Sequence, residues 1–554
     1  MYNVTVSSWK NKLYFGDNLD ILREHVTSES VDLIYLDPPF NSKATYNVLF
    51  QEKSGERSAA QITAFEDTWH WGMESEYAYR EVVKEGARKL ADLIQAFRLF
   101  LGQNDMMAYL TMMAQRLSEL HRVLKPSGSI YLHCDPTSSH YLKLLMDAVF
   151  GLKNYRNEII WKRRYGTFST VHTSNKFGSC TDSLLFYVRS EEALFHPQYS
   201  FNDKNYREYV ERTFKHTDEK GRRYRIADLA NPAPRPNLIY EYKGYKPPKN
   251  GWAISREKME QWDKEGRLYF PKSPDGRIQR KRFFDELKGK PVQSLWDDIE
   301  MISSQSAERL GYPTQKPETL LERIIHSSSK EGDLVLDPFC GCGTSIAVAE
   351  RLKRRWIGID ITHLAISLMR HRLRDTLGPE LSPYEVIGDP KDLSSARALA
   401  EENRYQFEWW ALGLVDARPA QDKRKGADRG VDGYINFFDD NSGKAKTIIV
   451  QVKSGGVTRS YIATLKGDRE REKAPIGILI TLEEPTKPML EEAATAGYYE
   501  PEHFPGYQYP RIQILTIREL LDGKEAQYPR MAPPATFKRA QRHRVSLEDQ
   551  QRLV

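Results

Sequence analysis

Cysteine, long apolar runs and an excess of one charge are all scarce in this sequence. Its 554 residues include only 4 cysteines, too few for the disulfide framework of a secreted scaffold. No run is apolar over the length that crosses a bilayer, and the N-terminus lacks the pattern of a secretory signal. No Gly-x-x-x-x-Gly-Lys-Ser/Thr loop is present, so no ATP-driven motor is evident. We therefore expect a cytoplasmic protein with reduced thiols and about three domains.

The charges nearly balance, but the basic residues are clustered. Lysine and arginine number 82 against 76 acidic residues, which gives a net charge of +6. Three basic groups occur, at 277–282, 351–355 and 538–544. One such group is ordinarily a solvated surface, whereas three in a weakly basic chain favour a polyanionic partner.

A short apolar run at residues 31–36 is followed by Asp37-Pro38-Pro39-Phe40. The run is typical of a buried parallel strand, and two prolines force the chain to turn after it. Asp37 should therefore lie at the carboxyl edge of the sheet, where open α/β sheets bind ligands. The Asp37 carboxylate and the Pro38 carbonyl offer two adjacent acceptors, and Phe40 offers a flat apolar face. This combination suits a planar heterocycle with an exocyclic amine; an ordinary strand-ending turn is the alternative.

Strands and helices alternate on either side of this motif. Strand-like runs at 13–15, 31–36 and 129–133 are separated by helical patterns, which predicts a doubly wound α/β sheet. Residues 41–105 interrupt the alternation with a polar insertion, either a flap over substrate or a surface excursion.

The alternation returns near residue 313. A buried strand at 334–336 ends in a glycine-rich turn, and the next strand ends at Asp360. Such a turn lets the backbone approach a ligand closely, and the acid can accept ribose hydroxyls. Ile346 stands where a dinucleotide fingerprint needs its third glycine, which disfavours a dehydrogenase.

Between these two α/β parts, residues 151–304 interleave basic and aromatic residues among short strand-like runs. Arginine and lysine in such a setting contact phosphates and base edges, so the segment fits a nucleic-acid-reading surface. An irregular β-rich domain with a charged exterior is the alternative.

Taken together, these motifs closely resemble the S-adenosylmethionine-dependent DNA amino-methyltransferases over roughly residues 11–375. The catalytic motif precedes the cofactor loop, as in the permuted β class, whose intervening segment is the target recognition domain. The resemblance implies double-stranded DNA as partner, S-adenosylmethionine as cofactor, and Asp37, Pro38, Pro39 and Phe40 as catalytic residues. It also implies that the cofactor is bound by Asp17, Thr314, Lys316, Asp337, Phe339, Gly341, Gly343, Thr344 and Asp360.

The chemistry of such an enzyme follows from these residue types. An exocyclic amine is a poor nucleophile, and acceptance of its protons by Asp37 and the Pro38 carbonyl would aim its lone pair at the methyl group. Positioning would supply most of the acceleration, and the base must leave the duplex to reach the site. Aspartate rather than serine in the first motif position resembles the adenine (N6) members more than the cytosine (N4) ones.

The C-terminal part resembles the restriction-endonuclease fold, in the branch with Gln-x-Lys in place of Glu-x-Lys. The resemblance implies Mg²⁺ ligation by Glu408, Asp432 and Gln451, and activation of the attacking water by Lys453. Retained cleavage is less secure than the fold, because glutamine is a weaker ligand than a carboxylate.

We therefore expect a methyltransferase sheet, an inserted β-rich recognition domain and a C-terminal α/β nuclease-like domain, together forming a restriction-modification protein in one chain. The expected boundaries are 1–150 and 305–400 for the methyltransferase, 151–304 for target recognition, 401–530 for the nuclease-like domain and 531–554 for a basic tail. A solitary methyltransferase whose C-terminal domain only binds DNA is the first alternative, and a non-catalytic DNA-binding scaffold is the second. The sequence leaves open the DNA recognition sequence and whether the protein forms a homodimer.

Overall fold

The computed structural model divides the chain into two compact units. The large unit comprises Met1–His196 and Ser294–Val554, and the small unit comprises Pro197–Gln293. The structure describes residues 9–39, 70–163, 179–201, 204–273, 276–303, 306, 308–310, 312, 314–420, 430–439, 445–501 and 506–530. Phe40 and the basic group at 538–544 lie outside these ranges. Over the described ranges, no helix is long and apolar enough to cross a membrane.

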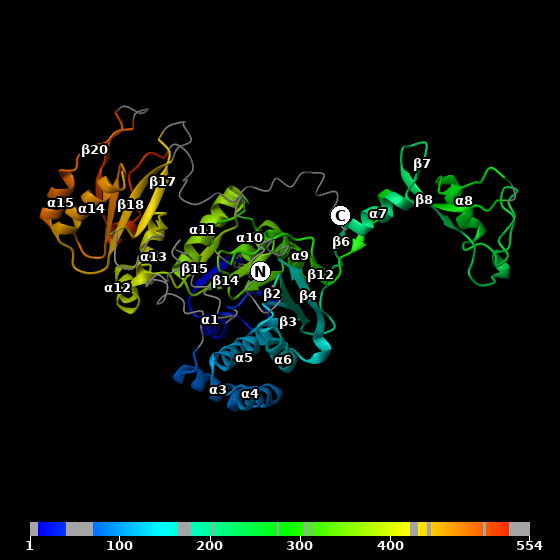
Figure 1. Ribbon diagram of the computed structural model, residues 1–554, viewed down its shortest axis with the longest axis horizontal. Coiled ribbons are helices and arrows are strands. Elements are labelled where there is room, and N and C mark those ends of the chain that lie inside the picture. The colour runs from blue at the N-terminus through cyan, green and yellow to red at the C-terminus, as the bar shows by residue number, and fades with distance from the viewer. Residues whose placement is uncertain are drawn as a thin grey trace, which may run out of the picture. The chain divides into compact units, whose positions relative to one another are not determined.

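A nine-stranded sheet forms the centre of the large unit, in the order β12-β4-β5-β3-β2-β13-β14-β1-β15 (Figure 1). The strands are β1 (Asn11–Phe15), β2 (Val31–Leu36), β3 (Leu124–Cys134), β4 (Tyr155–Lys162), β5 (Thr181–Val188), β12 (Leu295–Trp296), β13 (Leu334–Asp337), β14 (Arg355–Asp360) and β15 (Tyr384–Ile387). From β15 to β3 every pairing is parallel, whereas β5 runs antiparallel to both β3 and β4. The predicted α/β fold class is confirmed.

Helices cover both faces of this sheet (Figure 1). One face carries α1 (Asn18–His25), α5 (Asp105–Val123) and α6 (Ser139–Phe150), and the other carries α9 (Glu318–Ser328), α10 (Thr344–Arg351) and α11 (His363–Leu377). The described end of the 41–105 insertion forms α3 (Met73–Glu85) and α4 (Arg88–Leu101), which pack on α5. All four residues of β13 are buried, as expected for a strand covered on both sides.

The sheet extends further along the chain than the sequence predicts. We expected the first segment of the methyltransferase domain to end at residue 150, but β4 and β5 are strands of its sheet. They form an antiparallel pair without an intervening helix, which removes the βα rhythm on which the boundary was based. The compact inserted unit is therefore 197–293 rather than 151–304.

The small unit has a four-stranded antiparallel sheet in the order β7-β8-β10-β9. Its elements are β6 (Tyr199–Ser200), α7 (Lys204–Thr213), β7 (His216–Thr217), β8 (Arg223–Asp228), α8 (Arg256–Lys264), β9 (Leu268–Tyr269), β10 (Gln279–Phe283) and β11 (Lys290–Pro291). A small core around the fully buried Trp252 and Met259 stabilises it. The basic group at 277–282 belongs to this unit, and Arg280 lies over the Trp262 ring at 4.2 Å.

The C-terminal part of the large unit is a second α/β sheet, in the order β16-β17-β18-β19-β22. Its elements are α12 (Leu393–Glu402), α13 (Arg404–Leu414), β16 (Arg418–Pro419), β17 (Gly433–Phe437), β18 (Lys446–Lys453), α14 (Arg459–Arg471), β19 (Gly477–Thr481), α15 (Lys487–Ala494), β20 (Tyr498–Tyr499), β21 (Tyr509–Pro510), β22 (Ile512–Thr516) and α16 (Ile517–Leu521). Helix α13 packs against α11, so this sheet is joined to the first part through two helices.

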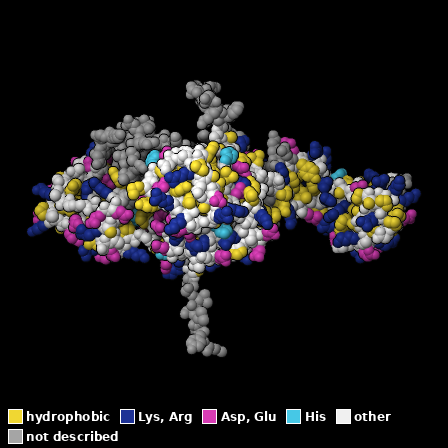
Figure 2. All heavy atoms as spheres, turned by 90° about the horizontal axis from the view of Figure 1, so that it is seen from below, with side chains coloured by type: hydrophobic (Ala, Val, Ile, Leu, Met, Phe, Trp, Pro, Cys, Tyr) yellow, Lys and Arg dark blue, Asp and Glu magenta, His cyan; other side chains and the backbone are white. Residues whose placement is uncertain are grey.

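The basic group at 351–355 is not a free cationic surface. Arg354 is 8% exposed, and its guanidinium donates to the carbonyl of Ser329 at 2.8 Å. Arg351 pairs with Glu318 at 2.6 Å. On the face seen in Figure 2, basic and acidic side chains are interspersed. The polyanion argument from this group is therefore weakened.

Candidate active site

The carboxyl ends of β2 and β13 lie side by side in the sheet. Val335 pairs with Leu33 and Leu336 with Ile34, so the two chains leave the sheet at the same edge. Asp337 ends β13, and Asp37 follows β2 directly. The structure thus brings the Asp37 motif next to the glycine-rich turn, although more than 290 residues separate them in the chain.

The Asp37 carboxylate has one bound oxygen and one bare oxygen. Its Oδ2 accepts a hydrogen bond from the Lys316 ammonium. Its Oδ1 is buried and has no hydrogen-bond partner within the described part of the chain. Pro38 is buried beside it. A buried acceptor without a donor is costly, so this oxygen marks a place where a donor group of a ligand fits.

The glycine-rich turn takes the left-handed conformation at two glycines. Gly341 has φ 51° and Gly343 has φ 71°. A Cβ at Gly343 would lie 2.4 Å from Met369 Cγ, and one at Gly341 would lie 3.2 Å from the Tyr312 ring. Both conformation and space therefore favour glycine at the two positions of this turn, which connects the end of β13 to the start of α10. This is the cradle expected of a nucleoside-binding loop.

Two acids flank this turn. Asp337 accepts from the Phe339 backbone N–H at 3.0 Å and from the Ser345 hydroxyl, and burial raises its pKa to about 7. The Asp360 carboxylate accepts from the Gly341 N–H at 2.9 Å, and burial raises its pKa as well. Buried acids with raised pKa values are characteristic of functional sites, because burial disfavours the charged carboxylate.

The turn after β1 contacts the glycine loop from the other side. The Asn18 amide donates to the Pro338 carbonyl at 2.8 Å. Asp17 caps α1 through the Leu19 N–H at 2.7 Å, and Arg116 pairs with both of its carboxylate oxygens, at 2.9 and 2.8 Å. Asp17 therefore precedes the residue that contacts the loop, and its carboxylate is engaged by Arg116, which sequence reasoning missed.

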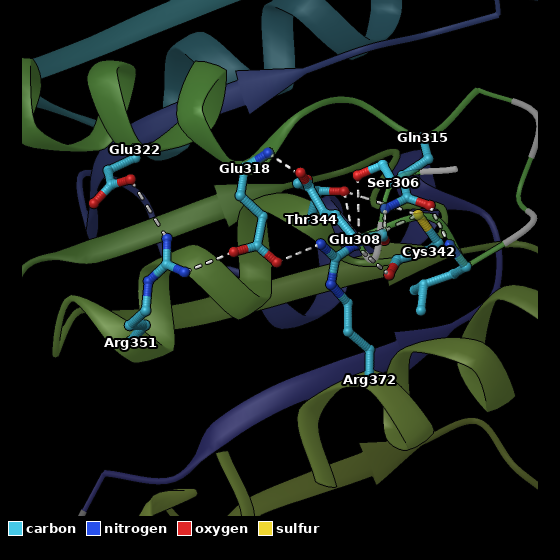
Figure 3. A network of polar contacts seen from close by, with 10 residues as sticks. Ser306, Glu308, Gln315, Glu318, Glu322, Cys342, Thr344, Arg351 and Arg372 are labelled. Carbon is cyan, nitrogen blue, oxygen red and sulfur yellow. Dashed lines mark hydrogen bonds and ion pairs between the residues drawn. The ribbon is translucent and has the colours of Figure 1, made fainter. Parts of the chain in front are cut away.

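A buried ionic network supports the loop from behind (Figure 3). Arg372, fully buried on α11, donates to the Thr344 hydroxyl at 2.8 Å, to the Cys342 carbonyl at 3.4 Å and to Glu318 at 2.8 Å. Arg351 pairs with the other Glu318 oxygen. Burial alone would raise the pKa of Glu318, but the two arginines outweigh it and hold the pKa below its ordinary value.

The segment before α9 closes this side of the site. The Gln315 side chain accepts from the Leu310 N–H at 2.8 Å and donates to the Glu308 carbonyl at 2.7 Å. The Glu308 carboxylate in turn accepts from the backbone N–H of Glu318 (Figure 3). Thr314 is exposed. Tyr312, against Gly341, was not singled out from the sequence; its pKa is raised well above the ordinary value by burial and by Asp360.

The C-terminal residues predicted to form a nuclease site are partly assembled. The Lys453 ammonium, at the end of β18, lies 3.9 Å from Asp432, which directly precedes the neighbouring strand β17. Asp432 accepts from the Val452 N–H at 2.8 Å, and the Gln451 amide donates to Asp468 at 2.7 Å. Glu408 is buried on α13.

This arrangement does not fit a magnesium centre. Within the ranges that the structure describes, no three histidine, cysteine, aspartate or glutamate side chains gather as a metal-binding group. The one neutral ligand, Gln451, is already bound to Asp468, and a lysine ammonium stands beside Asp432. We therefore derive no step through Mg²⁺.

Comparisons with known proteins identify similar families over two parts of the chain. The family model described as "DNA methylase" (N6_N4_Mtase) matches residues 31–370, and the model "NACHT-associated inactive Restriction Endonuclease 1" matches 406–522. The chain is 27% identical over 400 residues to the type II methyltransferase M.EcaI of Enterobacter cloacae, covering 72% of this chain and 76% of that protein. It is 26% identical over 358 residues to the DNA adenine methyltransferase YhdJ of Escherichia coli K12, covering 65% and 81%.

One relative and one solved structure extend this picture. The StyLTI Mod subunit of a type III restriction-modification enzyme from Salmonella typhimurium is 25% identical, covering 60% of this chain and 49% of that protein. The solved PvuII DNA methyltransferase, described as cytosine-N4-specific, is 13% identical with a TM-score of 0.30, covering 65% of this chain and 85% of that one. The permuted β class and the Gln-x-Lys branch stay predictions. Because the first family model spans more than half of the sequence, the chain belongs to the DNA methylase family.

Proposed function

We propose that this protein transfers a methyl group from S-adenosylmethionine to the exocyclic amine of a base in DNA. The observation that carries the proposal is the bare, buried Oδ1 of Asp37 at the sheet edge beside the glycine turn. An amine N–H is the donor that this oxygen lacks, and the Pro38 carbonyl offers a second acceptor in the adjacent peptide.

The residues of the turn suit the cofactor. Asp337 and Asp360 place carboxyl groups beside a turn that requires glycine at 341 and 343, and both accept hydrogen bonds from its backbone. When bound, S-adenosylmethionine supplies an electrophilic methyl group on a positively charged sulfur. The protein's own part is to hold the amine nitrogen facing that carbon, and such positioning accounts for a large share of catalysis without a strong base.

Adenine N6 is the target that we propose. Aspartate opens the catalytic motif, a feature of the adenine members in the family resemblance, and YhdJ is described as an adenine methyltransferase. Cytosine N4 is the alternative.

The test uses the full-length protein, DNA and cofactor with an isotopically labelled methyl group. Asp37→Asn should lower the single-turnover rate by about 100-fold or more, because the amine loses its charged acceptor. Asp32→Asn is the matched control: Asp32 lies at the opposite end of β2 and pairs with Lys125 at 2.7 Å. Label in N6-methyladenine is expected. Label in N4-methylcytosine would reassign the base, and equal labelling by Asp37→Ala would remove the proposed function.

For the C-terminal domain we propose DNA binding without cleavage. The absence of a fitting metal centre in the described residues and the match to an inactive nuclease family support this alternative over a domain that cleaves DNA. Unmethylated supercoiled plasmid should stay intact with Mg²⁺ or Mn²⁺. Cleavage that disappears in Lys453→Ala would instead establish the nuclease. If the domain binds DNA through a contact between Lys453 and a phosphate, Lys453→Ala should lower the slope of log K against log salt concentration by about 1.

A further inference from the structure

Lys316 reaches the proposed catalytic carboxylate rather than only the cofactor side of the site. The family resemblance assigns it to the cofactor, yet its ammonium contacts Asp37 Oδ2 and lies 3.5 Å from the Thr314 carbonyl. The two side chains are only 12% and 16% exposed, so water screens the pair weakly.

This ion pair gives the two carboxylate oxygens of Asp37 different roles. Oδ2 is occupied by the ammonium, and Oδ1 is buried with no partner in the described part of the chain. A free aspartate side chain could turn about its last bond and present either oxygen, because that torsion is soft. A charged donor fixed on Oδ2 removes this freedom and leaves Oδ1 with one direction.

We propose that Lys316 is a positioning residue for methyl transfer, which holds Asp37 Oδ2 so that Oδ1 alone receives the amine N–H of the target base. This inference rests on the proposed function. It assigns the lysine to the nucleophile side of the reaction, in addition to any part that it plays in binding the cofactor.

The step that Lys316 supports is a simple displacement. The amine nitrogen forms a bond to the methyl carbon while the carbon–sulfur bond breaks, and its electron pair stays on sulfur, which becomes neutral. The nitrogen then carries the positive charge and gives up one proton to Asp37 Oδ1, from which it passes to solvent. Lys316 keeps its own protons throughout. Its task is geometric, and misplacement of a reacting group by about 1 Å costs about 100-fold in rate.

The test separates positioning from cofactor binding. Lys316→Met keeps the length of the side chain and removes the charge, and Lys316→Arg keeps the charge with a different geometry. Lys125→Met is the matched control, because Lys125 forms the other lysine–aspartate pair of β2, with Asp32 at 2.7 Å. Single-turnover methyl transfer at saturating cofactor and the cofactor Kd by calorimetry are measured for each variant.

We expect Lys316→Met to lose about 100-fold in rate while its cofactor Kd stays within about threefold of wild type. Lys316→Arg should recover part of the rate. Lys125→Met should keep the rate within about twofold, since the half-buried pair of Lys125 and Asp32 lies at the opposite end of β2 and does not touch the reacting groups. In an Asp37→Asn background, Lys316→Met should change the rate by less than about threefold, because the two residues act as one unit.

Three results would overturn the inference. One is a weakened cofactor Kd with a normal rate at saturation, which would return Lys316 to the cofactor alone. Another is that Lys316→Met lowers the rate by a further 100-fold or so when it is added to Asp37→Asn. The third is a Lys316→Met rate equal to that of wild type. Should Lys316→Met not fold, Lys316→Gln, which also removes the charge, decides by the same criteria. A wild-type protein that methylates no DNA would instead remove the proposed function, and this inference with it.

Discussion

Replacement of Arg372 by methionine tests whether the network behind the glycine loop stabilises the fold and the site. The guanidinium is fully buried and binds Glu318, Thr344 and Cys342 at 2.8, 2.8 and 3.4 Å. Removing one partner of a buried ion pair costs about 3–5 kcal/mol, because the other charge is left uncompensated. Glu318 keeps Arg351, so we expect the lower end of that range, about 3 kcal/mol.

The loss should appear as a lower melting temperature and a weaker cofactor Kd. For a domain of this size, 1 kcal/mol corresponds to about 2–4 °C, so Arg372→Met should melt about 6–12 °C below wild type. Arg351→Met is the comparison: its side chain is 18% exposed and Glu318 keeps the fully buried Arg372, so its loss should cost less than the loss of Arg372. Scanning calorimetry and cofactor titration measure both effects.

The change in stability caused by a second substitution tests this explanation. Adding Glu318→Gln to Arg372→Met removes a buried negative charge whose remaining partner is Arg351, and should recover part of the stability. A single variant that melts within about 2 °C of wild type, or a double variant that is less stable than Arg372→Met, would show that the buried charges do not carry the cost.

Two further predictions concern the glycine loop. Ionised Asp337 is disfavoured in the fold, since its pKa is about 7 against 3.8 ordinarily. The stability that protonated Asp337 contributes is therefore fully present below pH 3.8 and is lost as the pH rises through 7. In urea unfolding, Asp337→Asn should gain about 3 kcal/mol of stability relative to wild type between pH 5 and pH 8, and a pH-independent difference would refute this. Gly343→Ala should lose about 2 kcal/mol or more through its φ of 71° and its contact with Met369; Gly497→Ala, with φ 72° and nothing within 4 Å, isolates the backbone contribution, and equal losses in the two variants would remove the steric argument.

The sequence predicted the strands and turns of the site because their signals are local. An apolar run before Asp37 and another before Asp337 are enough to place both at a sheet edge, and the strand pairing bears this out. Phe40, the remaining catalytic residue of the prediction, lies outside the described residues.

What the sequence did not predict depends on pairings between distant positions. Arg116 and Arg372 stand in the middle of helices, where an arginine is ordinarily a solvated side chain, and only the fold brings them to Asp17 and Glu318. β4 and β5 were excluded from the sheet because antiparallel pairing leaves no βα rhythm to detect. Composition and local sequence patterns cannot identify such partners, since neighbours that are remote in the chain decide which side chains are buried.

Helix α11 has consequences for how this chain can be divided. Met369 and Arg372, on this helix, lie against the glycine-rich turn. Leu364 of the same helix shares an apolar cluster with α13, and His371 lies 3.3 Å from Asp416. A fragment that ends near residue 400, where the sequence suggests a domain boundary, would expose the face of α11 that packs on α13. A different face of the same helix supports the glycine-rich turn. Dissection experiments and domain transplants in this protein therefore have to carry α11 and α13 together.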